Sequence, residues 1–386
     1  MDNQKVTVKE PLFHVAKRDN LPTKYKVLIY ACAIILALVI GSITCALIGE
    51  RGNPAVFFSS LFNGALGSER KIFKFLKDTS LLLCVSMALL PAFKMKFWNL
   101  GANGQILVGG LAAIACMWYM GRGAEGAISD TVIIICSTLA SMVAGAVWAV
   151  IPAIFKALFN TNESLFTLMM NYIAQSLVLL MIAIWVQGTG KTTLPEINYG
   201  HLPILFGKRE ILTILMGVLI TSAMFAYLKF SKQGYELSLV GDSQNTARYT
   251  GINVKKVIIR TLIVSGAICG IVGLLLTAGA VTPTIGTNTA NNMGFTAIMT
   301  TWLGGNNPLF IAGTCALVSF VNNGMSEVKT NFGIQSDVYA NVVIGIVYFF
   351  IIACAFLVQY KVTLRKRKKQ DKENGFLNGE DNKEVK

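Results

Sequence analysis

Apolar runs of about twenty residues recur along most of this 386-residue chain, and they constrain its fold more than any other feature. A helix of about twenty apolar residues spans the hydrocarbon core of a bilayer, so a series of such runs indicates a polytopic membrane protein. The composition agrees, because 54% of the residues are hydrophobic and only 14% are charged, whereas soluble domains carry about 25% charged residues. We therefore predict an all-α bundle that is integral to the membrane.

The apolar runs predict about ten passes. The first run, residues 27–49, is too long for a signal-peptide core and is expected to be retained. Residues 55–66 are apolar but short. Residues 69–78 mix basic and apolar side chains, which predicts an amphipathic helix at the membrane surface before a short second span at residues 79–93. The remaining spans are predicted at 105–120, 131–152, 164–186, 210–228 and 257–281, with short passes at 295–303 and 308–321 and a last span at 338–360.

Lysine and arginine are distributed unevenly between the two sides that these passes define. With the N-terminus inside, the inner segments hold 24 of the 34 cationic residues and the outer segments hold 10. Cytoplasmic segments are enriched in Lys and Arg, so both termini are expected in the cytoplasm of a cell-membrane protein. Residues 1–26 and 361–386 are then tails that flank a membrane domain at 27–360. The basic tails would face anionic lipid headgroups, which accounts for the net charge of +14 without a nucleic-acid partner.

The longest polar interruption is residues 229–260, which hold six cationic residues and are predicted to be a cytoplasmic loop. Asp242 or Ser243 can cap a short helix from about residue 244 to 250, and Gly251 can end it. Such a short helix has little stability alone, so we expect a partner surface to pack on it. A solvated connector between two spans is the alternative.

Two breaks rich in glycine and asparagine interrupt the apolar pattern at residues 97–105 and 303–308. Both follow a short apolar run, and Leu100–Asn103 aligns with Leu303–Asn306 as a faint internal repeat. Broken helices in corresponding positions of a transporter point to its pathway. Two ordinary turns between spans are the alternative.

Uncharged polar side chains gather at these breaks and inside the spans. Unpaired polar groups are costly in hydrocarbon, so such side chains should face the bundle interior or water. They can bind a substrate without a fixed charge, or they can hold helices together. Asn171 and Gln175, four residues apart, share one helical face. The candidate pathway residues are Asn99, Asn103, Gln105, Asn171, Gln175 and Asn306.

Four motifs carry a resemblance to a known family. Residues 99–105 read Asn-Leu-Gly-Ala-Asn-Gly-Gln, residues 162–174 hold Asn-Glu-Ser and Leu-Met-Met-Asn-Tyr-Ile-Ala, residues 241–252 hold Gly-Asp-Ser and Thr-Ala-Arg-Tyr-Thr-Gly-Ile, and residues 303–308 read Leu-Gly-Gly-Asn-Asn-Pro. In this order they resemble motifs of permease subunits of the simple-sugar and nucleoside branch of ABC importers. The resemblance covers most of the chain.

The resemblance implies a permease subunit that forms a translocation pathway and catalyses no reaction itself. It implies three partners, namely a cytoplasmic ATPase, a second related permease subunit and an extracellular substrate-binding lipoprotein of the basic-membrane-protein type. It implies nucleosides as the substrate, with simple sugars as the alternative. Asn103 replaces the usual acid of the family, and Ser238, Leu239 and Thr246 also depart from its pattern, which leaves the substrate and ATPase contacts open. The residues expected to couple to the ATPase are Gln244, Asn245, Ala247, Arg248, Tyr249 and Gly251.

Other signals point to neither an intrinsic ATPase nor a cofactor. Residues 188–193 imitate the end of a nucleotide-binding loop, but Trp185 stands where that loop needs glycine. The two histidines have no metal-ligand spacing, and the eight cysteines lie in apolar runs as small fillers, so no metal is expected. An ion-driven secondary transporter would favour acids inside the membrane, which the spans lack away from their ends. A membrane scaffold or receptor would leave the two breaks without a purpose.

Overall fold

The computed structural model describes residues 13–17, 22–48, 53–122, 129–186, 190–279, 283–305, 307–334 and 360–364, with short helical pieces between residues 342 and 353. The chain divides into two compact units. One unit comprises Met1–Thr44 and Asn341–Lys386, and the other comprises Cys45–Ala340.

The first unit contains a small antiparallel sheet that the sequence did not predict. Strand β1 (Phe13–Lys17) pairs with β2 (Tyr360–Leu364), so that Phe13 lies opposite Leu364 and Lys17 opposite Tyr360. Residues 13–17 and 360–364 are therefore joined by backbone hydrogen bonds. Most of α1 (Thr23–Ile48) also belongs to this unit, and most of the span predicted at 338–360 lies outside the described residues.

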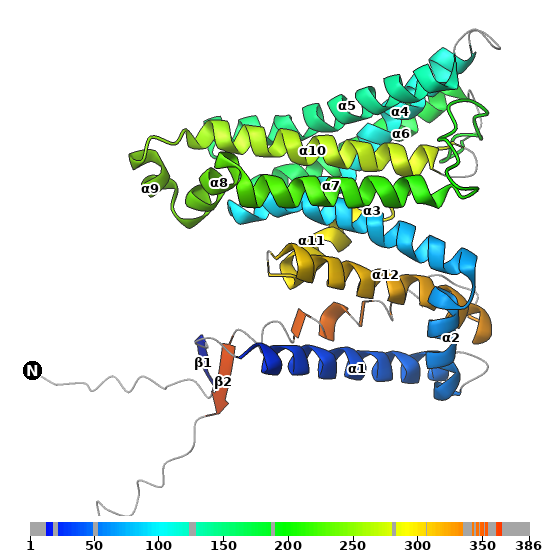
Figure 1. Cartoon of the computed structure of the whole chain (residues 1–386), viewed down its shortest axis with the longest axis vertical. Helices are drawn as coiled ribbons and strands as arrows, with labels where there is room; N and C mark the ends of the chain where they lie inside the picture. The colour runs from blue at the N-terminus through cyan, green and yellow to red at the C-terminus, as the bar shows by residue number, and fades with distance from the viewer. Residues whose placement is uncertain are drawn as a thin grey trace, which may run out of the picture. The chain divides into compact units, whose positions relative to one another are not determined.

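The second unit is a bundle of helices (Figure 1). Seven helices of the described chain are long and apolar enough to cross a membrane, which confirms the predicted helical membrane fold. They are α3 (Glu69–Lys94), α4 (Ala102–Arg122), α5 (Asp130–Phe159), α6 (Glu163–Trp185), α7 (Glu210–Phe230), α10 (Val254–Ala278) and α12 (Pro308–Asn331). The shorter helices are α2 (Pro54–Leu66), α8 (Lys232–Asp242), α9 (Gln244–Tyr249) and α11 (Met293–Leu303).

The predicted surface helix at 69–78 and short span at 79–93 are wrong, because α3 is one continuous helix of 26 residues. Its N-terminus is capped by Ser68, whose side chain accepts a hydrogen bond from the Lys71 amide. A helix of this length extends about 39 Å, which exceeds the hydrocarbon thickness of about 30 Å. The basic first turns can therefore project beyond the hydrocarbon, while the stretch from Ser80 to Phe93 is buried in the bundle.

Helix α10 packs against α5, α4 and α3 at the centre of the bundle. A Cβ atom on Gly266 would lie 2.3 Å from the carbonyl oxygen of Gly145, and one on Gly270 would lie 2.1 Å from that of Ser141. Small residues allow this approach, which is how helices associate in lipid without a hydrophobic driving force. Gly266 and Gly270, four residues apart on α10, therefore lie in the contact between α10 and α5. The cysteines in the described ranges are free thiols.

The end of α3 leads the chain directly into the first break. The Lys96 amide donates to the Phe93 carbonyl at 3.0 Å, and the Phe97 amide donates to the Ala92 carbonyl at 2.9 Å. These two bonds form a Schellman motif, in which Lys96 takes the left-handed position with φ 58°. The chain is then non-helical from Phe97 until α4 begins at Ala102.

Candidate functional site

The first break is held in place by side chains of α6. Asn171 Oδ1 accepts a hydrogen bond from the Gly104 amide at 2.8 Å, and Asn171 Nδ2 donates to the Leu100 carbonyl at 2.8 Å. Thr167 Oγ1 accepts from the Leu100 amide at 3.1 Å. Non-helical backbone at membrane depth must find such partners inside the protein. Asn171, predicted as a pathway residue, thus has a structural role in which both of its amide atoms are used.

Asn103 connects the break to α11. Its Oδ1 accepts a hydrogen bond from the Gly294 amide at 2.7 Å. Asn292, the residue that precedes α11, makes no side-chain cap bond, so Asn103 supplies from another helix the acceptor that an N-cap usually provides. A Cβ atom on Gly294 would lie only 2.7 Å from the Asn103 nitrogen. The residue that replaces the family's usual acid therefore lies in a tight contact between two helix starts.

Asn99 and Gln105 are buried at the break, with 0% and 1% of their surface exposed. Asn99 Oδ1 accepts from the Gly101 amide at 3.0 Å and from Gln105 Nε2 at 3.4 Å. The remaining amide atoms, Asn99 Nδ2 and Gln105 Oε1, have no hydrogen-bond partner within the described parts of the chain. A buried polar atom without a partner costs about 1–3 kcal/mol. The break thus contains one unused donor and one unused acceptor.

Two of the predicted pathway residues lie apart from these contacts. Gln175 is half-buried on α6, one turn beyond Asn171. Asn306 lies outside the described residues. The structure therefore brings Asn99, Asn103, Gln105 and Asn171 together around one break.

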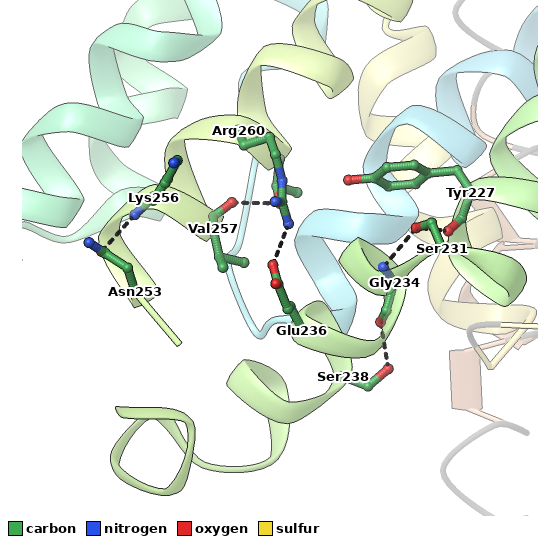
Figure 2. A network of polar contacts seen from close by, with 10 residues as sticks. Tyr227, Ser231, Gly234, Glu236, Ser238, Asn253, Lys256, Val257 and Arg260 are labelled. Carbon is green, nitrogen blue, oxygen red and sulfur yellow. Dashed lines mark hydrogen bonds and ion pairs between the residues drawn. The ribbon is translucent and has the colours of Figure 1, made fainter. Parts of the chain in front are cut away.

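The polar segment between α7 and α10 folds into two helices, whereas the sequence predicted only the second. The N-terminus of α8 is capped by Ser231, whose hydroxyl accepts from the Gly234 amide at 3.1 Å and donates to the Tyr227 carbonyl at 2.6 Å (Figure 2). The signal for α8 was present in the sequence, because Ser231 precedes apolar residues three apart, Leu237 and Val240, which are both buried.

An ion pair joins α8 to α10. Arg260 Nη2 donates to Glu236 Oε2 at 3.0 Å, and both side chains are more than two-thirds buried (Figure 2). Asn253 caps the start of α10, because its Oδ1 accepts from the Lys256 amide at 3.1 Å. These bonds fix the two helices that flank α9.

The bounds predicted for the short helix α9 are confirmed to within one residue. Ser243 is the cap, and its hydroxyl accepts from the Thr246 amide at 3.3 Å. Gly251 ends the helix in the left-handed region at φ 81°, and the Ile252 amide donates to the Ala247 carbonyl at 2.9 Å. This is the same Schellman pattern that ends α3, here with the glycine that the motif prefers.

Ala247, one of the residues expected to couple to the ATPase, is fully buried within this chain, so its side chain presents no surface to a partner here. It belongs to an apolar group, the α9 cluster, with residues of α3, α5, α8 and α10 and of the break. Met95 and Phe97, which lead into the break, belong to the same cluster. The α9 cluster consists of Ala92, Met95, Phe97, Ala149, Ala153, Leu237, Val240, Ala247, Val254, Val257, Ile258 and Leu262.

The opposite face of α9 is open. Gln244, Asn245 and Arg248 are exposed, and Tyr249 is 92% exposed. A groove of about 390 Å³ begins at the turn after α9 and lies between α8, this turn and the start of α10. It is mainly cationic and includes Tyr235 and Asn253. Its charged lining residues are Lys232, Glu236, Lys256 and Arg260.

Residues 71–352 match the family described as the permease component of branched-chain amino acid transport systems. The chain belongs to this family. It is the permease of an ABC importer from the group that serves branched-chain amino acids, simple sugars and nucleosides. The permease is a multi-pass membrane protein and is not catalytic itself, and membership of the family implies an ATPase and a binding protein as partners.

Three relatives resemble this permease over most of its length. The nucleoside ABC transporter permease protein NupB of Lactococcus lactis is 28% identical over 346 residues, which cover 86% of this chain and 92% of NupB. The guanosine ABC transporter permease protein NupP of Bacillus subtilis is 28% identical over 342 residues, with 87% and 95% covered. The glucose ABC transporter permease protein TsgB13 of Haloferax volcanii is 27% identical over 346 residues, with 85% and 88% covered. No solved structure matches the chain.

Proposed function

We propose that this permease imports nucleosides, with energy supplied by a separate cytoplasmic ATPase. The observation that carries this proposal is the uncharged pair at the first break, where Asn99 Nδ2 and Gln105 Oε1 remain unused. The edge of a nucleobase presents donors and acceptors side by side, which such a pair can bind. The names of NupB and NupP support the same substrate class. The pair is buried in this conformation, so contact with a substrate requires the break to open.

Both termini are proposed to lie in the cytoplasm. The pairing of β1 with β2 supports a common side for the two ends of the chain, and the excess of Lys and Arg on the inner segments supports the cytoplasmic side. Helices α8 and α9 then lie at the cytoplasmic end of α7. We propose cytoplasmic tails at residues 1–26 and 361–386, a membrane domain at 27–360 and a cytoplasmic loop at 229–260.

The exposed face of α9 and the groove beside it are proposed as the ATPase contact, with Gln244, Asn245, Arg248, Tyr249 and Gly251 at the surface. Tyrosine and arginine are favoured at such interfaces, and the cationic groove suits acidic side chains of the partner. Ala247 would transmit the movement instead of contacting the ATPase, because it belongs to the same α9 cluster as Phe97. The Asn99 amide donates to the Phe97 carbonyl at 3.1 Å, so displacement of α9 would be passed to the pair at the break.

The proposed assembly also contains a second, related permease subunit and an extracellular substrate-binding lipoprotein. Uptake of labelled guanosine, adenosine and glucose tests the substrate, in cells that lack their own importers and express this chain with these partners. We expect the two nucleosides to accumulate, and we expect a substitution in the ATP-binding site of the ATPase to abolish uptake. Glucose uptake alone would establish the sugar alternative. Uptake that persists without ATP but stops when ion gradients collapse would establish a secondary transporter.

A further inference from the structure

The two breaks, about two hundred residues apart in the sequence, meet at a pair of tryptophans. Trp98 lies in the first break, and Trp302 lies at the end of α11, directly before the second break. Their ring centroids are 5.8 Å apart at an interplanar angle of 57°. Phe93, from the end of α3, lies 5.7 Å from Trp98 in an edge-to-face arrangement. The faint repeat in the sequence thus corresponds to a contact in space.

A cavity of about 360 Å³ opens beside these rings. Its volume falls within the range of about 300–1,000 Å³ that is usual for small-molecule sites. Trp98 and Trp302 are 40% and 59% exposed, so their ring faces are accessible. The lining combines three aromatic rings with charged groups, and consists of Phe93, Lys94, Lys96, Trp98, Gly241, Asp242 and Trp302.

The end of α8 forms one wall of the cavity, through Gly241 and Asp242. A Cβ atom on Gly241 would lie 1.9 Å from the Lys94 carbonyl oxygen, so α8 and the end of α3 are in direct backbone contact. Displacement of α8 would therefore change the shape of the cavity. Lys96 holds a left-handed backbone conformation, φ 58°, which is uncommon for a long side chain and concentrates at functional positions.

Tryptophans near the ends of spans often anchor a protein in the membrane interface. Anchoring does not require two rings in contact, and it gives no reason for the rings to border a cavity that also contains Asp242 and two lysines. Discontinuous helices, in contrast, form substrate sites in transporters where they come together. The geometry favours a ligand over an anchor.

We propose that the Trp98–Trp302 cavity binds the planar heterocyclic base of the transported molecule. The base would stack on a tryptophan face, while Asp242 and the lysines bind its polar edge. Movement of α8 would then alter the cavity and release the base. This inference rests on the proposed function, because it assumes a nucleoside as the substrate.

Uptake of labelled guanosine at low concentration tests the inference with Trp302→Leu, Trp302→Phe and Trp98→Leu. Stacking of a base on an aromatic ring contributes about 1–3 kcal/mol, so Trp302→Leu should lower uptake about tenfold, whereas Trp302→Phe should retain at least about half. Tyr172→Leu is the matched control, because Tyr172 is an exposed aromatic side chain of α6 outside the cavity, also 59% exposed. All variants are compared at equal membrane abundance and equal ATPase co-purification.

Photolabelling with 8-azidoadenosine gives a direct readout on the assembled transporter. Label should appear on peptides that contain residues 93–98 or 302, should be competed by guanosine, and should fall in Trp302→Leu. If Trp302→Leu transports and labels like Tyr172→Leu, the tryptophans are membrane anchors and the inference is overturned, while nucleoside transport still stands. If the unaltered transporter carries no nucleoside at all, the proposed function itself fails, and the inference fails with it.

Discussion

Asn171 shows at the scale of one residue how the first break is kept in shape. Its amide pairs with the Gly104 amide and the Leu100 carbonyl, two backbone groups that an unbroken helix would pair internally. Leucine has the same branching and the same number of side-chain heavy atoms as asparagine but no hydrogen-bonding atom. Each buried backbone group left unpaired costs about 1–3 kcal/mol.

We therefore expect Asn171→Leu to lower the thermal unfolding temperature of the detergent-purified protein and to reduce uptake. Gln175→Leu is the control, because Gln175 is half-buried one turn further along α6 and is expected to tolerate the change. Equal unfolding temperatures for the Asn171→Leu variant and the unaltered protein would show that these bonds do not stabilise the break.

The substitution Gly241→Ala tests the contact between α8 and the end of α3. An alanine there would place its Cβ 1.9 Å from the Lys94 carbonyl oxygen, and overpacking of this kind costs about 1–3 kcal/mol. We predict reduced thermal stability and reduced uptake for Gly241→Ala. Gly313→Ala in α12 is the control, because nothing lies within 4 Å of the added Cβ, and alanine favours a helix by about 1 kcal/mol over glycine. Similar melting curves for the two variants would argue against a close contact at Gly241.

At the scale of elements, α9 has one face that belongs to the bundle and one that does not. Ala247→Arg would bury a charge in the α9 cluster without a partner, which is strongly destabilising. We expect this variant to misfold and to be degraded, whereas Thr246→Arg, at an exposed neighbouring position, should insert normally. Membrane abundance and protease resistance distinguish the two. Normal abundance and protease resistance of Ala247→Arg would mean that α9 does not pack as the structure shows.

Sequence reasoning located α9 because its signals are local. A capping serine at position 243 and a glycine at position 251 act within one or two turns, whatever the rest of the chain does. It missed α8 because the polar surface of that helix outweighed the two apolar positions that anchor it. It divided α3 in two because basic residues were read as the edge of the membrane, whereas the helix continues through them.

At the candidate site, sequence reasoning was also limited to local patterns. The residue types at the first break were identified from the sequence, but their partners were not. Asn103 pairs with Gly294, 191 residues away, and no local pattern reveals such a contact. The meeting of Trp98 with Trp302 depends likewise on how α11 packs against α3 and α4.

At the scale of the whole molecule, the proposed orientation places α9 in the cytoplasm and the loop before α7 outside. Lys191 and Asn245 are exposed. Lys191 lies in the loop that leads into the N-terminal end of α7, whereas Asn245 lies in α9, which follows the C-terminal end of α7 and α8. A membrane-impermeant maleimide should label Lys191→Cys in intact cells and should label Asn245→Cys only after lysis, in a background without reactive native thiols. The reverse pattern would invert the proposed orientation and remove α9 from the ATPase side.

The central claim is that a separate ATPase drives this permease through the exposed face of α9. Tyr249 and Phe206 provide a matched pair, because their side chains are 92% and 90% exposed and lie at opposite ends of α7. An aromatic residue at the heart of an interface contributes about 2 kcal/mol or more, which corresponds to roughly thirty-fold in affinity. Removing either side chain, that of Tyr249 or that of Phe206, should not affect folding, because neither packs in the bundle.

The most direct test is therefore the affinity of the purified ATPase for the permease in lipid nanodiscs, measured for Tyr249→Ala and Phe206→Ala. The account predicts that Tyr249→Ala weakens ATPase binding at least about tenfold and lowers ATP-driven uptake in parallel, while Phe206→Ala leaves ATPase affinity unchanged. Unchanged ATPase affinity in Tyr249→Ala, with normal uptake, would contradict it.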